Sequence, residues 1–504
     1  MAAHQGFRIS WRHGKIERSP VIATFMPVVQ PKTDLFRTTD VARFLSQCQQ
    51  QATDGRQAKI ASLSFPIAPV APWEVLQTLG NPQKRHFYYD PPHQPSMVGL
   101  DVVVEASAVG KTRFDQAQFF VEQWRSHFIY ARPAYPHRLP GELAMQQPSF
   151  QPPFGHFFCS ATFFDDTVTA SFEPTYVFVP QLQVATRLDA SIVTFNVLVT
   201  VAADIKQITA RLHRQLRALV DCKATGQAPV TSHKVTTKDV AGFEPAVKAV
   251  LAPVKNGRLH KVVLADVMDV VTPQPIDEVR SLQTLRHNHP DCTVFSVSNG
   301  KGQSFIGASP ERLLSIRKGQ LTTDALAGSA SRSPLRGIDH QLAQSLLHSE
   351  KERYEHRVVV EFIVHQLRSL GLSPHYASSP QILQLTNIQH LHTPISALLS
   401  PHSISPLEII DKLHPTPAVA GLPRQLACQL IRQHETFDRG LYAAPLGWMD
   451  TEGNSEFIVG IRSALIDGCK ARLYAGAGIV SGSEPAKELA EIKLKLQTLL
   501  NALV

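Results

Sequence analysis

Two segments of the sequence each carry a pair of glutamates three residues apart. The pairs are Glu352 with Glu355 and Glu488 with Glu491. Residues three apart lie on one face of a helix. Either pair alone favours solvated glutamates that complement a helix dipole. Together the pairs could hold one Mg²⁺, which prefers oxygen ligands and keeps several waters: one carboxylate from each helix would bind the ion, and the second of each pair would orient a bound water.

A lysine and a further glutamate occupy positions suited to proton transfer. Lys261 lies inside the apolar run His-Lys-Val-Val-Leu-Ala, and Glu311 follows the Gly-Ala-Ser-Pro turn. Burial lowers the pKa of a lysine and raises that of a glutamate, which would make Lys261 a general base and Glu311 a general acid. The patterns alone favour simpler interpretations, namely an edge-strand lysine and a turn carboxylate that faces solvent.

Glycines and an arginine could bind the carboxylates of a small substrate. Gly476 and Gly478 form a Gly-Ala-Gly sequence, and Gly328 precedes Ser329. Backbone N–H groups can approach an anion closely at such positions, although a single Gly-x-Gly usually marks only a turn. Arg462 ends an apolar run and could bind a carboxylate bidentately, or could simply be a surface arginine.

Apolar spacing indicates the elements that would position these side chains. It predicts helices at residues 203–220, 349–370 and 484–500, the last two with Ser349 and Ser483 as N-caps. Strands are predicted at residues 60–65, 97–104, 157–164, 176–184, 259–271, 293–297 and 304–307. Strands that do not alternate regularly with helices favour an α+β fold. The polar stretch 221–237 is the best boundary, so we expect an N-terminal β-rich region at 1–240 and a catalytic domain at 241–504.

Composition limits the class of protein. The chain has 504 residues, 43% of them hydrophobic and 18% charged, which is typical of a globular protein. The N-terminus lacks an apolar secretion signal, and no run reaches the roughly 20 apolar residues of a membrane helix, so we expect a cytoplasmic location. The six cysteines form no Cys-x-x-Cys pair, which favours reduced thiols over a zinc site. The net charge of +8 is spread along the chain, which argues against nucleic-acid binding and fits a solvated surface or attraction of a small polyanion.

Taken together, these segments resemble the chorismate-utilising enzymes, a family of isochorismate and salicylate synthases related to the large subunits of anthranilate and aminodeoxychorismate synthases. The resemblance covers roughly residues 240–504. The matching blocks, in the family's order, are Lys261-Val-Val-Leu, Gly307-Ala-Ser-Pro-Glu311, Ala327-Gly-Ser329, Ser349 to His356, Gln389 to Thr393, His414-Pro-Thr-Pro-Ala418, Arg439-Gly-Leu-Tyr442, and Ala475 to Glu491.

The resemblance implies a fold like that of anthranilate synthase component I, with large antiparallel sheets layered with helices. It implies that Lys261 activates a water and that Glu311 is the general acid. It also implies that Glu355 and Glu491 bind Mg²⁺, with Glu352 and Glu488 supporting the ion through water. The implied substrate-binding residues are Gly328, Ser329, His390, Ala418, Tyr442, Arg462, Gly476, Gly478 and Lys495.

Three positions favour one reaction within the family. Anthranilate synthases carry Gln at the position of Lys261, and aminodeoxychorismate synthases carry Lys at the position of Ala327. Ala418 stands where salicylate synthases typically have Thr. We therefore expect Mg²⁺-dependent isomerisation of chorismate to isochorismate by a monomer that needs no amidotransferase subunit, with menaquinone biosynthesis as the preferred pathway. A salicylate synthase and a non-catalytic anion-binding paralogue are the alternatives.

Overall fold

A computed structural model describes the side chains and packing of residues 38–131, 155–166, 171–187, 190–220, 236–238, 242–386, 388–400 and 404–503, with the backbone of 7–10 and 28–29. Strands and helices mix in an order that confirms the predicted α+β class. The predicted boundary at 221–237 falls mostly outside the described residues, and the division at residue 240 stays a prediction. Within the described part, no helix is long and apolar enough to cross a membrane. The cytoplasmic location stays a prediction.

The strands form two antiparallel series that both begin at β8 (Thr175–Arg187). The first series runs through β5 (Ser96–Ala108), β4 (His86–Asp90), β12 (Thr293–Ser298), β13 (Gln303–Ser309), β22 (Ser463–Asp467), β23 (Lys470–Ile479) and β11 (Lys261–Val271). The second runs through β7 (His156–Ala161), β20 (Pro445–Asp450), β21 (Ser455–Val459), β14 (Arg312–Arg317), β15 (Gln320–Ser331) and β18 (Ile388–Leu398).

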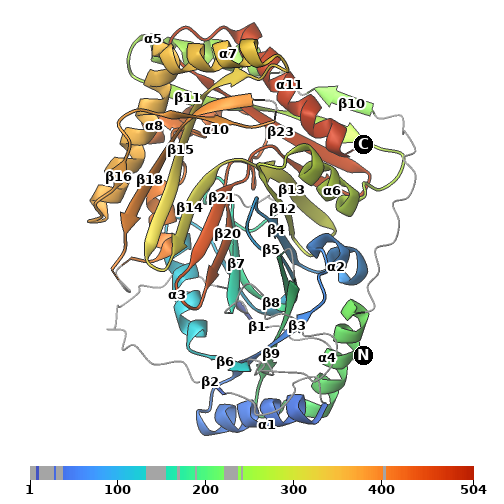
Figure 1. The fold of residues 1–504 in the computed structure, drawn as a ribbon. Helices are drawn as coiled ribbons and strands as arrows, with labels where there is room; N and C mark the ends of the chain where they lie inside the picture. Colours follow the sequence, from blue (N-terminus) through green and yellow to red (C-terminus); the bar gives the residue numbers. More distant parts are fainter. Residues whose placement is uncertain are drawn as a thin grey trace.

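Shorter strands extend these series. β19 (Gly421–Leu422) and β10 (Thr236–Asp239) pair with β11, and β16 (His375–Tyr376) and β17 (Gln381–Gln384) pair with β18. β9 (Ala190–Val199) pairs with the C-terminal part of β8. β3 (Lys59–Ile67) pairs with β9, and β6 (Phe128–Ala131) pairs with β3. β1 (Phe7–Ser10) and β2 (Val28–Val29) add parallel edges to β5 and β6. Figure 1 shows β15 and β18 on the left of the upper half and β12 and β13 on the right.

The helices cover the outside of the sheets (Figure 1). They are α1 (Thr38–Asp54), α2 (Pro72–Leu79), α3 (Arg113–Arg125), α4 (Ile205–Val220), α5 (Phe243–Lys255), α6 (Glu278–Asn288), α7 (Arg336–His348), α8 (Glu350–Ser369), α9 (Pro406–Leu413), α10 (Arg424–His434) and α11 (Pro485–Leu503). Helix α8 packs on β15 and α11 packs on β23, so each predicted carboxylate helix lies on the next-to-last strand of a different series.

The two carboxylate helices differ in how they begin. The Ser349 hydroxyl accepts from the Glu352 N–H at 3.4 Å, which confirms Ser349 as the N-cap of α8. Ser483 is not the N-cap of α11: that helix starts at Pro485, and the Ser483 hydroxyl accepts from Val480 N–H at 3.2 Å. The hydroxyl therefore closes the turn between β23 and α11 instead of capping the helix.

The cysteine prediction is confirmed where it can be examined. Cys48, Cys159, Cys292, Cys428 and Cys469 are free thiols, and Cys222 lies outside the described residues.

Candidate active site

Lys261 and Glu355 form an ion pair at the first residue of β11. Lys261 Nζ lies 2.7 Å from Glu355 Oε1, and the lysine side chain is 3% exposed. The interpretation of Lys261 as an edge-strand surface residue is therefore wrong: β11 lies between β23 and β19, and α5 and α10 pack against it. Gly478 of β23 lies directly over the pair, because a Cβ on it would sit 2.9 Å from Lys261 Cε and 3.1 Å from Glu355 Oε1.

Glu311 is buried in the turn between β13 and β14. The pKa of its carboxyl is raised to about 8, chiefly by loss of solvent; the charge of Lys261 opposes this rise and the charge of Asp324 adds to it. The solvent-facing interpretation of Glu311 is wrong. The carboxyl keeps its proton at neutral pH, which is the form a general acid requires.

The fold brings carboxylates of the two helices together, a step the sequence could not make. Burial raises the pKa of Glu352, and the neighbouring charges of Glu355 and Glu491 raise it further. Burial likewise raises the pKa of Glu488, with added contributions from Glu491 and Glu355. Like charges from α8 and α11 thus act on one another.

The carboxylate oxygens of this cluster are the kind of ligand that Mg²⁺ prefers. In this structure the carboxylates are bound by Lys495 and by other hydrogen-bond donors of the protein. Glu355 pairs with Lys261, Glu491 Oε1 lies 2.8 Å from Lys495 Nζ, and Glu352 Oε2 accepts from the Ser329 N–H at 3.2 Å. Across the described residues, no three His, Cys, Asp or Glu side chains form a ready metal site. The donor set and the mutual repulsion fit a hard cation. Mg²⁺ binding stays a proposal.

Tyr442, Gly476 and Lys495 meet on one side of the cluster. Lys495 Nζ donates to the Gly476 carbonyl at 2.9 Å, and a Cβ on Gly476 would lie 2.7 Å from the Tyr442 hydroxyl. Tyr442 is buried, and this burial raises the pKa of its phenol, so the hydroxyl stays a donor. Gly476 therefore lies against both of the other predicted substrate-binding residues.

Gly328, Ser329 and His390 form a second wall of the site, at an irregularity in the β15–β18 pairing. Gly328 has a φ of +74°, a conformation that favours glycine, and a Cβ there would lie 3.1 Å from Glu352 Oε2. His390 Nδ1 hydrogen-bonds the Gly328 carbonyl at 3.2 Å. Burial, together with the charges of Arg462 and Lys495, lowers the pKa of His390 to about 3.

His390 therefore stays neutral, Nδ1 carries the proton, and Nε2 is an acceptor. Among the residues that the structure describes, this buried Nε2 has no hydrogen-bond partner. An unsatisfied buried nitrogen is costly, and it marks a place where a ligand donor would be stabilised.

Arg462 follows β21 with a left-handed backbone, φ +50°. Its guanidinium contacts Cys292 Sγ at 3.8 Å, and within the described ranges no carboxylate forms an ion pair with it. A side chain other than glycine in this conformation is uncommon, and such residues cluster at functional sites. The guanidinium lies close enough to His390 to lower its pKa, as does Lys495, so two cations act on the same wall.

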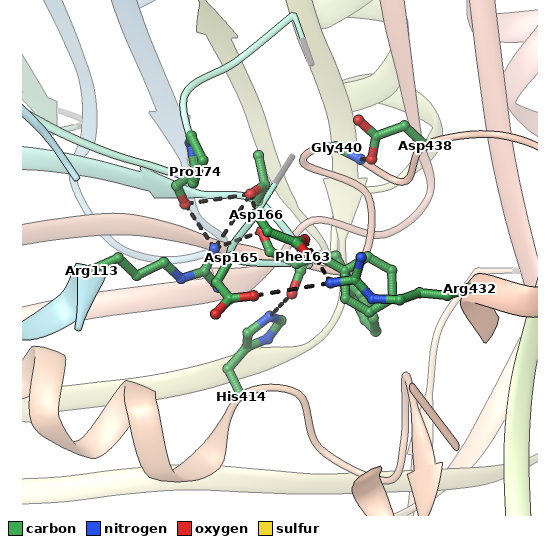
Figure 2. Close-up of polar contacts among 11 residues, drawn as sticks. Arg113, Phe163, Asp165, Asp166, Pro174, His414, Arg432, Asp438 and Gly440 are labelled. Atoms are coloured by element: carbon green, nitrogen blue, oxygen red, sulfur yellow. Dashed lines mark hydrogen bonds and ion pairs between the residues drawn. The ribbon is translucent and has the colours of Figure 1, made fainter. Parts of the chain in front are cut away.

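Ala418 lies half-buried in the segment between α9 and β19, which is held from both sides. Figure 2 shows His414 beside Phe163, whose carbonyl accepts from His414 Nε2 at 3.2 Å. From the other side, Arg439 Nη1 donates to the Val419 carbonyl at 2.9 Å. The N-terminal strands thus help to hold the segment that carries Ala418.

Sequence reasoning missed Asp324 of β15. Arg312 donates to it through Nε and Nη2 at 3.0 and 3.1 Å, and His392 Nε2 lies 2.9 Å from its Oδ1. Asp324 is a charged residue within a mostly apolar run, which is the same signal that singled out Lys261.

Comparisons with known proteins agree on the family. A family model described as a chorismate binding enzyme matches residues 43–504. The isochorismate synthase MenF of Bacillus subtilis is 32% identical over 83% of this chain and 88% of its own. A protein of Pseudomonas aeruginosa, named salicylate biosynthesis isochorismate synthase, is 42% identical over 52% of this chain. That second alignment covers about half of the Pseudomonas protein, 54%.

Solved structures share the fold. MenF of Escherichia coli, described as a menaquinone-specific isochorismate synthase, superposes with a TM-score of 0.72 at 25% identity, over 91% of this chain and 100% of its own. Component I of anthranilate synthase from Streptococcus pneumoniae has a TM-score of 0.59 at 18% identity, over 86% and 92%, which confirms the predicted fold alone. The chain belongs to the family of chorismate-binding enzymes.

Proposed function

We propose that the protein is an isochorismate synthase, an isomerase that converts chorismate to isochorismate. The observation that carries the proposal is the burial of a lysine and a protonated glutamate in one site: the charge of Lys261 acts on Glu311, whose pKa of about 8 keeps it an acid at neutral pH. The names of the relatives that align over most of either chain support the same reaction.

The chain's residues divide the proposed reaction between a base and an acid. Lys261 takes a proton from a water molecule that attacks C2 of the ring. Glu311 gives its proton to the C4 hydroxyl, which leaves as water while the ring double bonds shift. One water enters and one leaves, so the substrate and product are isomers.

The remaining site residues would bind and orient the two substrate carboxylates. Arg462 has a guanidinium free of carboxylate partners among the described residues, and Lys495 lies beside Gly476. Neutral His390 presents an unpaired Nε2 to the site. Mg²⁺ held by Glu355 and Glu491, with Glu352 and Glu488 acting through water, would neutralise a substrate carboxylate and stabilise charge that develops on it.

The proposal extends to menaquinone biosynthesis, because the Escherichia coli MenF structure, which aligns over 91% of this chain, is described as menaquinone-specific. The salicylate-biosynthesis relative keeps a second pathway open for the same product. We further propose that the protein acts as a monomer without an amidotransferase subunit, since its nucleophile is water rather than ammonia.

Incubation of the purified protein with chorismate, with and without Mg²⁺, tests the reaction once the products are separated by chromatography. Mg²⁺-dependent isochorismate without stoichiometric pyruvate supports the proposal. Pyruvate together with salicylate would make the protein a salicylate synthase. No conversion would overturn the proposal and leave an anion-binding paralogue.

A further inference from the structure

A buried ion pair takes the place of a neighbouring strand beside the middle of β11. One edge of β11 pairs with β23 along residues 262–271. On the other edge, β19 pairs with residues 261–262 and β10 with residues 268–271, and the described residues provide no strand for the stretch between them. Buried backbone groups need hydrogen-bond partners. Here two side chains supply them: Glu435, which directly follows α10, and Arg439.

The ion pair binds the β11 backbone through two hydrogen bonds. Glu435 Oε1 accepts from the Ala265 N–H at 2.8 Å, and Arg439 Nη2 donates to the Val263 carbonyl at 2.8 Å. Within the pair, Arg439 donates from Nε to Glu435 Oε2 at 2.8 Å and from Nη2 to Oε1 at 2.5 Å. The two side chains are 1% and 4% exposed, so water does not compete for these contacts.

The bound stretch of β11 lies opposite the two glycines of the candidate site. Val263 is the register partner of Gly478, and a Cβ on Gly478 would lie 2.9 Å from Lys261 Cε. Ala265 is the register partner of Gly476. A Cβ on Gly476 would lie 3.3 Å from Val263 Cγ1. A displacement of β11 therefore changes the space at both glycines.

The guanidinium of Arg439 also contacts two other parts of the site. Its Nη1 donates at 2.9 Å to the carbonyl of Val419, the residue after Ala418. Its Cζ lies 5.7 Å from the ring centre of Tyr442, and the Arg439 carbonyl accepts from the Tyr442 N–H at 2.7 Å. A planar guanidinium presents its donors in a fixed geometry, so it can set the relative positions of these segments.

We propose that Glu435 and Arg439 are positioning residues for substrate binding: their ion pair holds the β11 backbone opposite Gly476 and Gly478 in the place that the substrate carboxylates require. The pair acts through the backbone and does not touch the substrate. The inference rests on the proposed function, because it concerns how chorismate is bound.

The first test is the steady-state kinetics of the double variant Glu435→Gln/Arg439→Gln with chorismate and saturating Mg²⁺. The double change removes both charges together, so no unpaired charge stays in the core. One short amide at position 439 cannot reach the carbonyls of Val263 and Val419 at once. We expect KM to rise about tenfold or more, as for a loss of substrate binding, with a smaller change in kcat.

The second test reports the same contact without turnover. Loss of the ion pair should speed hydrogen–deuterium exchange in residues 262–267 of the double variant, measured by mass spectrometry of peptides. Residues 293–298 of β12, which pair with β4 and β13, should exchange as in the wild type.

Asp269→Asn/Arg472→Gln is the matched control. Asp269 of β11 accepts from Arg472 of β23 at 2.7 and 2.9 Å, an ion pair between the same two strands. Both side chains are more than a third exposed, at 36% and 39%, and Asp269 lies near the end of β11 remote from Lys261. Loss of this pair should leave both KM and the exchange of residues 262–267 unchanged.

A raised KM together with faster exchange in residues 262–267 supports the inference. A double variant that loses heat stability but keeps the wild-type KM shows a merely structural ion pair and overturns it, as does a raised KM without faster exchange. Should the double variant fail to fold, Arg439→Lys decides, because an ammonium keeps the charge but not the planar fork, and an unchanged KM would contradict the inference. A wild-type protein that makes no isochorismate refutes the proposed function itself, a result separate from the exchange measurement.

Discussion

At the scale of single residues, burial decides what Glu311 can do. Loss of solvent is the largest cause of its raised pKa of about 8, and it outweighs the opposing charge of Lys261. The same residue type at Glu352 and Glu488 gathers with like charges, which suits a cation better than proton donation. Sequence spacing alone could not separate these roles, and the family resemblance assigned them. The exposure of a turn carboxylate cannot be derived from its neighbours in sequence.

The raised pKa of Glu311 predicts a loss of activity at alkaline pH. The protonated acid is present below about pH 8 and is lost as the pH rises through that value, so kcat/KM falls on the alkaline side. Glu311→Gln should lower turnover on the order of 10²–10⁴-fold.

The folded state holds the Glu311 proton more tightly than the unfolded state, so the contribution of Glu311 to stability is greatest at low pH and is lost as pH rises through the folded pKa. Thermal unfolding should therefore show the stability of Glu311→Gln rising relative to that of the wild type between about pH 5 and pH 9. An unchanged difference in stability would contradict the raised pKa assigned to Glu311.

Gly478 is a second residue-scale test. A methyl at this position would lie 2.9 Å from Lys261 Cε and 3.1 Å from Glu355 Oε1, so Gly478→Ala must displace the ion pair. We expect kcat to fall at least about tenfold with the fold retained, because a small misplacement of a catalytic group is enough. Gly337→Ala in α7 is the control, since the added methyl would meet no atom within 4 Å and alanine favours a helix. Equal turnover in both variants would show that the Lys261–Glu355 geometry is unimportant.

At the scale of elements, helix periodicity predicted both carboxylate helices to within three residues at their ends. The apolar faces of α8 and α11 carry that signal because each packs on a strand. Strands β15 and β18 were not predicted, since polar residues such as Asp324 and His392 interrupt their apolar runs. Those interruptions are where β15 and β18 line the candidate site, so function obscured the local pattern there.

The meeting of α8 and α11 predicts how activity depends on Mg²⁺. Glu355→Gln and Glu491→Gln each remove one carboxylate from the cluster, so each should raise the Mg²⁺ concentration needed for half-maximal activity by about tenfold or more. Glu484→Gln is the control: this exposed residue directly precedes α11, and Lys487 is its ion-pair partner among the described residues. A Mg²⁺ titration that is the same in all three variants would exclude these helices as the metal site.

At the scale of the whole molecule, strands from the two halves of the chain are interleaved. β4 pairs with β12, and β7 pairs with β20, so each series crosses from one half to the other. Arg432 adds a contact, 2.6 Å from Asp166 (Figure 2). Its guanidinium is also stacked over the ring of Phe164. The division at residue 240 came from composition, which carries no information on strand pairing across several hundred residues.

Residues 242–504 alone should not form a stable domain. Removing the N-terminal region would leave β12 and β20 as exposed edges and uncover apolar side chains such as Phe295 and Trp448, which favours aggregation. We expect the fragment to be insoluble or to lack a cooperative thermal transition in circular dichroism. A monomeric, cooperatively unfolding fragment would instead make the C-terminal half an independent domain.

The most direct test of the account is to run the wild-type reaction in water enriched in oxygen-18 and analyse the product by mass spectrometry. Attack of an activated water at C2, with loss of the C4 hydroxyl, predicts isochorismate that carries one solvent oxygen at its new hydroxyl, formed only when Mg²⁺ is present. Isochorismate without the label, or chorismate recovered unchanged, would contradict the roles assigned to Lys261 and Glu311.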